Sequence, residues 1–146
     1  MNIDIFARKF EDLLPDISRE FIKRQENALI KGVISLEQFL VMNYLYKKKA
    51  STMSDLSRYM STTLSASTGM INRMVKIKLV TRLKDESDRR VVKIELTEKG
   101  RNMMEKIVCQ RLRMIRNVFG RLSGDERKSY IDILEKMHNI LISENE

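Results

Sequence analysis

Apolar residues recur every three or four positions along much of the chain, and this spacing predicts a mainly α-helical protein. Near the N-terminus the pattern covers residues 6–22, where we expect Pro15 to kink the helix or divide it in two. Another helix should begin at Ser35, because Ser35 and Gln38 have the spacing of a capping box. Two long helices with the same apolar spacing are predicted after residue 97.

Two short helices joined by a tight polar turn are predicted in the middle of the chain. The first covers residues 54–60, and the Ser-Thr-Thr stretch 61–63 forms the turn. The second helix then covers residues 64–78. This order is typical of a helix-turn-helix, whose second helix enters the major groove of DNA.

A charged hairpin follows the second short helix. Apolar and charged residues alternate over residues 92–96, which predicts a half-buried strand. The less regular apolar stretch 79–85 should be its partner strand, and residues 85–90 should form the turn. The predicted fold class is therefore mainly α with a small β-hairpin.

The second short helix has two different faces when it is wound at about 100° per residue. The residues within about 60° of Asn72 are small, polar or basic, and comprise Ser65, Thr68, Gly69 and Lys76. The opposite side carries the apolar residues Met70, Met74 and Ile77. A merely solvated face usually carries long Glu and Lys pairs, whereas small polar residues let DNA approach and offer donors and acceptors to base edges. This pattern favours a DNA-contacting face, with a solvated face as the alternative.

The positive charge of the chain is concentrated in this middle region. The net charge is +8, and residues 47–101 contain 14 Lys and Arg against 6 Asp and Glu. The flanking segments are almost neutral, with 6 basic against 7 acidic residues before it and 8 against 7 after it. A local excess of this kind indicates an anionic partner, either nucleic acid or a membrane surface.

Composition excludes several other classes of protein. A hydrophobic fraction of 42% with 33% charged residues is typical of a soluble domain, and no apolar run approaches the ~20 residues of a membrane span. Charges in every turn of the N-terminus disfavour a signal peptide. The only cysteine, Cys109, rules out an intramolecular disulfide. Together with the only histidine, His138, it cannot supply the four ligands of a structural zinc site. We therefore expect a cytoplasmic protein without a metal or a cofactor.

The segment LVTRLKDESDRRVVKIELTEKG, residues 79–100, resembles the recognition-helix exit, the wing and the wing-to-helix cap of the MarR family of bacterial transcriptional regulators. The segments SLEQFLVMNYL and MSDLSRYM are similar to the second and third helices of that family. The resemblance implies a winged helix-turn-helix DNA-binding region at residues 34–101. Residues 1–33 and 102–146 would be dimerisation helices of the same single protomer, residues 1–146.

The resemblance also implies which residues meet DNA. Arg90 matches the family arginine that enters the minor groove, and Asp88 matches the acidic residue that braces the wing. A guanidinium suits a narrow, strongly negative groove, whereas Arg89 and Lys93 are expected to contact phosphates. The recognition-helix candidates are Ser65, Ser67, Thr68, Asn72, Arg73 and Lys76, and the wing candidates are Lys84, Asp88, Arg89, Arg90 and Lys93.

Two positions depart from the family pattern. Gly69 stands where the family often has a larger and frequently basic residue, so one familiar DNA contact should be missing. Lys78 replaces the usual glycine before the Leu-Val pair, so the recognition helix is expected to end differently.

The wide apolar stripes of the first and the last two helices suggest a protein partner, although packing on their own domain is the alternative. The resemblance implies a homodimer, whose two recognition helices would meet a pseudo-palindromic double-stranded operator with half-sites roughly 34–36 Å apart. It further implies a repressor released by a small-molecule effector or another signal. No residue cluster in the sequence identifies an effector pocket.

Other functions fit less well. A winged helix can be a protein-interaction module without specific operator binding, but its recognition face is then usually acidic or apolar. Cys109 suggests a thiol-based redox-sensing regulator, yet the sensing cysteines of the resembled family lie near the N-terminus. Membrane binding would need a basic amphipathic helix with a free apolar face. An enzyme is disfavoured, because His138 has no nucleophile motif nearby and the glycines form no phosphate-binding loop.

Overall fold

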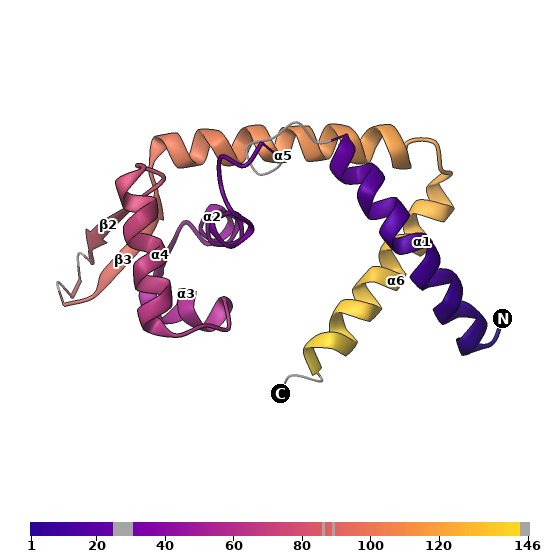
Figure 1. The fold of residues 1–146 in the computed structure, drawn as a ribbon, viewed down its shortest axis with the longest axis horizontal. Helices are drawn as coiled ribbons and strands as arrows, with labels where there is room; N and C mark the ends of the chain where they lie inside the picture. Colours follow the sequence, from indigo (N-terminus) through magenta and orange to yellow (C-terminus); the bar gives the residue numbers. More distant parts are fainter. Residues whose placement is uncertain (25–30, 86, 89, 144–146) are drawn as a thin grey trace. The chain divides into compact units, whose positions relative to one another are not determined.

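The computed structural model describes residues 1–24, 31–85, 87–88 and 90–143 (Figure 1). The chain divides into two compact units, Met1–Gln110 and Arg111–Glu146. The elements are α1 (Ile3–Lys23), α2 (Leu36–Lys48), β1 (Ala50–Thr52), α3 (Met53–Tyr59), α4 (Leu64–Lys76), β2 (Val80–Lys84), β3 (Val92–Leu96), α5 (Glu98–Phe119) and α6 (Gly124–Ser143). This mainly helical chain with a small sheet confirms the predicted fold class.

The helices begin where side chains can accept hydrogen bonds from free backbone N–H groups. At α2 the Ser35 hydroxyl accepts from the Gln38 amide at 3.2 Å, and the Gln38 side chain accepts from the Ser35 amide at 2.9 Å. The predicted capping box is therefore confirmed. Thr52 caps α3 through the Asp55 amide at 3.2 Å, so this helix begins at Met53, one residue earlier than the sequence predicts.

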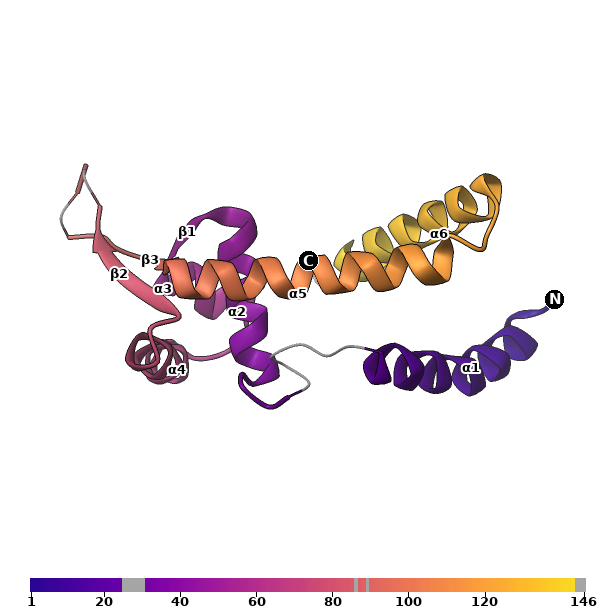
Figure 2. The same ribbon diagram turned by 90° about the horizontal axis from the view of Figure 1, so that it is seen from above.

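A three-stranded antiparallel sheet with the order β1-β3-β2 replaces the expected two-stranded hairpin. Ala50 pairs with Glu95 at one end of β1, and Thr52 pairs with Lys93 at the other. The strand β1 was missed because three residues are too short to show an alternating pattern. The expected pairing of β2 with β3 is confirmed, and both strands extend side by side from the helices to form the wing (Figure 2).

One apolar core holds α2, α3, α4, the sheet and the first half of α5 together. Each of these elements contributes at least one side chain that is almost inaccessible to water, including Leu45, Leu56, Ile71, Ile94 and Met104. The core thus holds α4 by its inner face and leaves its outer face exposed. Burying such side chains stabilises a fold by about 1.5–3 kcal/mol each.

The helix α1 continues through Pro15 as a single element. Of the two outcomes predicted for Pro15, a kink or a division, the division is therefore wrong. A proline inside a helix removes one backbone hydrogen bond. Glu11, whose carbonyl loses that bond, is exposed, and water can satisfy its oxygen. No residue of α1 is buried, and eight of its large apolar side chains are between 41% and 73% exposed.

In the second unit a short turn leads from α5 into α6. The Ser123 amide donates to the Glu126 carboxylate at 2.7 Å, and the Glu126 amide donates to the Ser123 hydroxyl at 3.2 Å, which makes a capping box. The rings of Phe119 and Tyr130 lie 5.2 Å apart. No residue of α6 is buried, and its apolar side chains are between 40% and 59% exposed. No helix in the described part of the chain has the length and apolar character that crossing a membrane requires.

Candidate DNA-binding surface

The helix α4 is built as a recognition helix would be, with a buried side and an exposed side. Thr63 caps its start by accepting from the Ala66 amide at 3.1 Å. Met70, Ile71 and Met74 anchor the inner side in the core. The exposed side includes four of the predicted contact residues, Ser65, Asn72, Arg73 and Lys76.

Ser67 does not belong to the exposed side, so its assignment as a DNA contact is wrong. It is 1% exposed, and its hydroxyl has no hydrogen-bond partner among the described residues. The physical reason is helical geometry, since five residues of separation place Ser67 roughly 140° around the helix from Asn72. The small side chain instead lets α4 approach the core closely.

Thr68 is partly exposed, and its hydroxyl is already engaged. The Thr68 Oγ1 donates to the Leu64 carbonyl oxygen at 2.7 Å, one turn earlier in the helix. Because this bond uses the hydroxyl proton, Thr68 can meet DNA only through its oxygen lone pairs or its methyl group. Thymine methyl groups and base amino donors are the matching features of the major groove.

The side chain of Arg73 lies close to Gly69 on the exposed side of α4. A Cβ atom at Gly69 would lie 3.7 Å from Arg73 Nη1, so the guanidinium extends over the glycine. The side chain that Gly69 lacks is thus partly replaced by Arg73 from the next turn. A positive group is therefore present where the family pattern led us to expect a missing contact.

Asn72 is hydrogen-bonded to the wing. Arg82 Nη2, on β2, donates to Asn72 Oδ1 at 2.7 Å, and both residues are exposed. The pair connects the outer side of α4 with the first wing strand. Ten residues separate the two side chains in the chain, and no local pattern indicates their contact.

The tip of the wing is organised by Asp85, which the sequence analysis did not single out. Its Oδ1 accepts from the Ser87 amide at 2.9 Å and the Asp88 amide at 3.2 Å, and it also accepts from the Ser87 hydroxyl. Its other oxygen forms an ion pair with Lys93. Lys93 first, and then the Ser87 and Asp88 donors, hold the pKa of the Asp85 carboxyl far below its usual value. An Asp two residues before a Ser is a common turn signal and could have identified it.

Asp88 acts more locally than predicted. Its Oδ1 accepts from the Arg90 backbone amide at 2.9 Å, and its own carbonyl accepts from the Val91 amide at 2.9 Å. Asp88 therefore orients the backbone that carries Arg90, while Asp85 anchors the turn as a whole. The Arg90 residue is exposed, as a groove contact requires.

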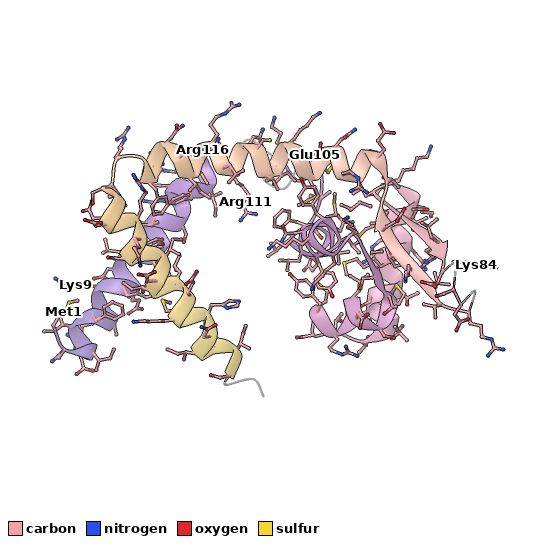
Figure 3. The ribbon with its side chains drawn as sticks, turned by 180° about the vertical axis from the view of Figure 1, so that it is seen from behind. Met1, Lys9, Lys84, Glu105, Arg111 and Arg116 are labelled. Atoms are coloured by element: carbon pink, nitrogen blue, oxygen red, sulfur yellow. The ribbon has the colours of Figure 1, made fainter. Side chains whose placement is uncertain are left out.

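The remaining wing candidates differ in how available their side chains are for contact with DNA. Lys93 is paired with Asp85, so its charge is partly neutralised and it is a weaker phosphate ligand than predicted. Lys84 is exposed at the last residue of β2, beside the hairpin tip (Figure 3). Arg89 lies outside the described residues.

The end of α4 is tied to the start of α5 by a set of short contacts that we call the exit clamp, formed by Ile77, Lys78, Leu79, Thr97, Lys99 and Gly100. The Thr97 hydroxyl donates to the Lys78 carbonyl at 2.6 Å, and Lys99 Nζ donates to the Ile77 carbonyl at 2.8 Å. A Cβ atom at Gly100 would lie only 2.1 Å from the Leu79 carbonyl oxygen, so the two backbones meet without room for a side chain. This contact fixes where α4 ends relative to the wing strands.

Lys78 adopts a φ of 60°, in the left-handed region that favours glycine. The helix therefore ends with the backbone conformation a glycine would supply, although a lysine is present. The exit clamp holds Lys78 in this conformation by its carbonyl oxygen. The cost is local backbone strain.

Cys109 and His138 are both exposed on helices, α5 and α6 respectively. Within residues 1–24, 31–85, 87–88 and 90–143, no three His, Cys, Asp or Glu side chains are grouped so that they could hold a metal ion.

Known proteins resemble the chain over nearly its whole length. The MarR family pattern matches residues 34–92. YsmB, an uncharacterized HTH-type transcriptional regulator of Bacillus subtilis, is 35% identical over 126 residues, which cover 86% of this chain and 84% of YsmB. A MarR family protein from Bacillus stearothermophilus is 30% identical, with a TM-score of 0.78 over 97% of this chain and 99% of that one. Staphylococcus aureus MepR bound to ethidium bromide is 25% identical, with a TM-score of 0.72 over 90% of this chain and 96% of MepR.

These similarities include both the helix-turn-helix and the wing, which are the elements that carry the exposed basic and polar side chains. They agree with the motif resemblance at residues 79–100 and with the observed order of helices and strands. The chain belongs to the MarR family of DNA-binding transcriptional regulators.

Proposed function

We propose that the protein is a cytoplasmic, homodimeric repressor that binds a pseudo-palindromic operator in double-stranded DNA. The observation that carries this proposal is the exposed side of α4, where small polar residues and the basic Arg73 and Lys76 lie beside the wing. The protein would bind DNA and regulate transcription without catalysing a reaction.

The chemistry of α4 suits the major groove. Ser65 and Asn72 offer short polar groups that permit a close approach to base edges. Arg73 and Lys76 supply positive charge in the second half of the helix, where phosphates or guanine acceptors can be reached. The wing would follow the adjacent minor groove, with Arg90 as its inserted side chain.

The dimer is supported by the two terminal helices. Neither α1 nor α6 buries a residue, and both expose many large apolar side chains. Apolar surface of this extent in a water-exposed protein marks an interaction site. A second copy of the chain would cover it and would place two recognition helices on two half-sites.

A small apolar or aromatic effector is consistent with the family. Staphylococcus aureus MepR binds ethidium, an aromatic cation. We propose that this protein also releases its operator when it binds a small molecule.

Selection of bound sequences from a random DNA pool, combined with sedimentation of the free and bound protein, tests the proposal. We expect a pseudo-palindromic consensus, a dimer that binds it, and an affinity that falls steeply with salt through counterion release. Binding that ignores sequence would favour a protein-interaction module instead. A monomer on a single half-site would contradict the dimer.

Arg90→Ala tests the wing within the same assay. Its loss should weaken operator binding by about 1–3 kcal/mol if the guanidinium makes a specific groove contact. Arg116→Ala removes the same charge from an exposed position in the second unit, and serves as the control provided that sedimentation shows it to keep the oligomeric state of the wild type. Equal affinities for both variants would contradict the role of Arg90.

A further inference from the structure

The contact between Asn72 and Arg82 limits which DNA bases Asn72 of the recognition helix α4 can recognise. Arg82 Nη2 lies 2.7 Å from Asn72 Oδ1, a short, charge-assisted hydrogen bond. A guanidinium has only donors, so it necessarily faces the carbonyl oxygen of the amide and not its NH2 group. The direction of the Asn72 amide is therefore set by a residue of the wing strand β2.

An asparagine that is free to turn reads adenine with both ends of its amide. Its Oδ1 accepts from the adenine amino group while its NH2 donates to N7. At Asn72 the oxygen already has a donor, and the Arg82 guanidinium brings positive charge and further N–H groups beside it. The oxygen keeps a second lone pair. An adenine amino group would have to reach it beside the Arg82 guanidinium, whose positive charge disfavours a further N–H donor.

The end of the Asn72 amide that Arg82 does not contact is its NH2 group, which only donates. Donors match the acceptor atoms of the major groove, and guanine presents two of them, N7 and O6, on one edge. Given the DNA-binding function proposed above, on which this step rests, we infer that Arg82 is a positioning residue for specificity. It orients Asn72 as a donor and makes it select guanine over adenine at one position of each half-site.

The inference assigns Arg82 a role distinct from phosphate binding. Arg82 is exposed and keeps further N–H donors that could reach a phosphate. Loss of such a phosphate contact would weaken binding to all sequences equally. Loss of the positioning role would instead change the preferred base at the position that Asn72 reads.

The test compares the bases selected from a random double-stranded DNA pool by the full-length protein and its variants. Asn72→Ala first identifies the base pair that depends on Asn72. Arg82→Met keeps much of the side-chain length but cannot donate, so the guanine preference over adenine at that base pair should fall about tenfold. Lys84→Met removes an equal charge from an exposed position of the same strand and should weaken binding without changing the preference.

Two further variants separate positioning from a general loss of structure. In the double variant Asn72→Ala with Arg82→Met, the preference should match that of Asn72→Ala alone, because the two residues act as one unit. Asn72→Asp keeps an acceptor for Arg82 but loses the donating NH2 group, and should therefore lose the guanine preference while melting at an unchanged or higher temperature. This variant remains informative if Arg82→Met folds poorly.

The outcomes are distinguishable from failure of the proposed function. A wild-type protein that selects no consensus would overturn DNA recognition itself. A guanine preference at the Asn72 position that persists in Arg82→Met, or a wild-type consensus that holds adenine at this position, would overturn only the role of Arg82.

Discussion

The Thr97 hydroxyl donates a hydrogen bond to the Lys78 carbonyl oxygen at 2.6 Å, which joins the start of α5 to the end of α4. The same hydroxyl accepts from the Gly100 amide at 3.1 Å and so caps α5. The Thr97 side chain thus stabilises both the start of α5 and the end of α4, which are far apart in the sequence. The position of the recognition helix depends on this contact.

Thr97→Val should lower the free energy of unfolding by about 1–2 kcal/mol, because it removes both the cap and the donor to Lys78 while keeping the side-chain volume. Chemical denaturation followed by circular dichroism measures the change. Thr97→Ser keeps the hydroxyl and should retain most of the stability. Equal stabilities of the Val and Ser variants would show that the hydroxyl contributes little.

Gly100→Ala should destabilise the first unit severely, by about 1–3 kcal/mol or more, because the new methyl group would meet backbone atoms that cannot move aside. Its Cβ would lie 2.1 Å from the Leu79 carbonyl oxygen and 3.3 Å from Leu96 Cδ2. Gly124→Ala is the matched control, since no atom lies within 4 Å of a Cβ there. Thermal melting of the two variants should differ clearly, and similar melting temperatures would contradict the close approach at Gly100.

Lys78→Gly should stabilise the protein by about 1 kcal/mol, because glycine adopts a positive φ without the steric cost that lysine bears. Lys78→Ala also removes the charge but keeps the Cβ atom, so it should give no such gain. Denaturation midpoints of the three proteins separate the backbone effect from the charge effect. A gain of the same size in the alanine variant would attribute the effect to charge.

The Asp85 carboxylate should make the wing sensitive to acid but not to pH changes near neutrality. Its pKa in the folded protein lies below the unfolded value of about 3.9, so its contribution to stability is fully present above that value. The contribution declines as the pH falls below about 4 toward the folded pKa. Protonation of Asp85 should therefore leave the rate of protease cleavage within the hairpin unchanged between about pH 5 and 8. Below about pH 4 it should raise that rate.

Asp85→Asn should make cleavage of the hairpin faster already at neutral pH, because it removes the ion pair with Lys93. Asp88→Asn keeps an oxygen that can accept from the Arg90 amide and serves as the control. If Asp88→Asn loosened the hairpin more than Asp85→Asn, the anchor would be Asp88, as the family pattern suggested.

Much of the fold could be predicted because its signals are local. Capping pairs such as Ser35 with Gln38 act across three residues, and apolar spacing reports which side of a helix meets the core. The strand β1 was not predicted because it is short and forms by pairing with β3, which lies more than 40 residues later in the chain. Pro15 does not divide α1, because the helix around it tolerates one missing hydrogen bond.

The candidate site was predicted less completely. Charge and apolar spacing are properties of the chain itself, and they were enough to indicate a recognition helix and a basic hairpin. The resemblance to the MarR family singled out Arg90. Tertiary structure decided that Ser67 is buried, that Lys93 is paired with Asp85, and that Asn72 is held by Arg82. Such pairings depend on how β2 and β3 lie against each other and against α4. Packing of the shared core sets that placement, and no local stretch of sequence encodes the distance between two side chains on different elements.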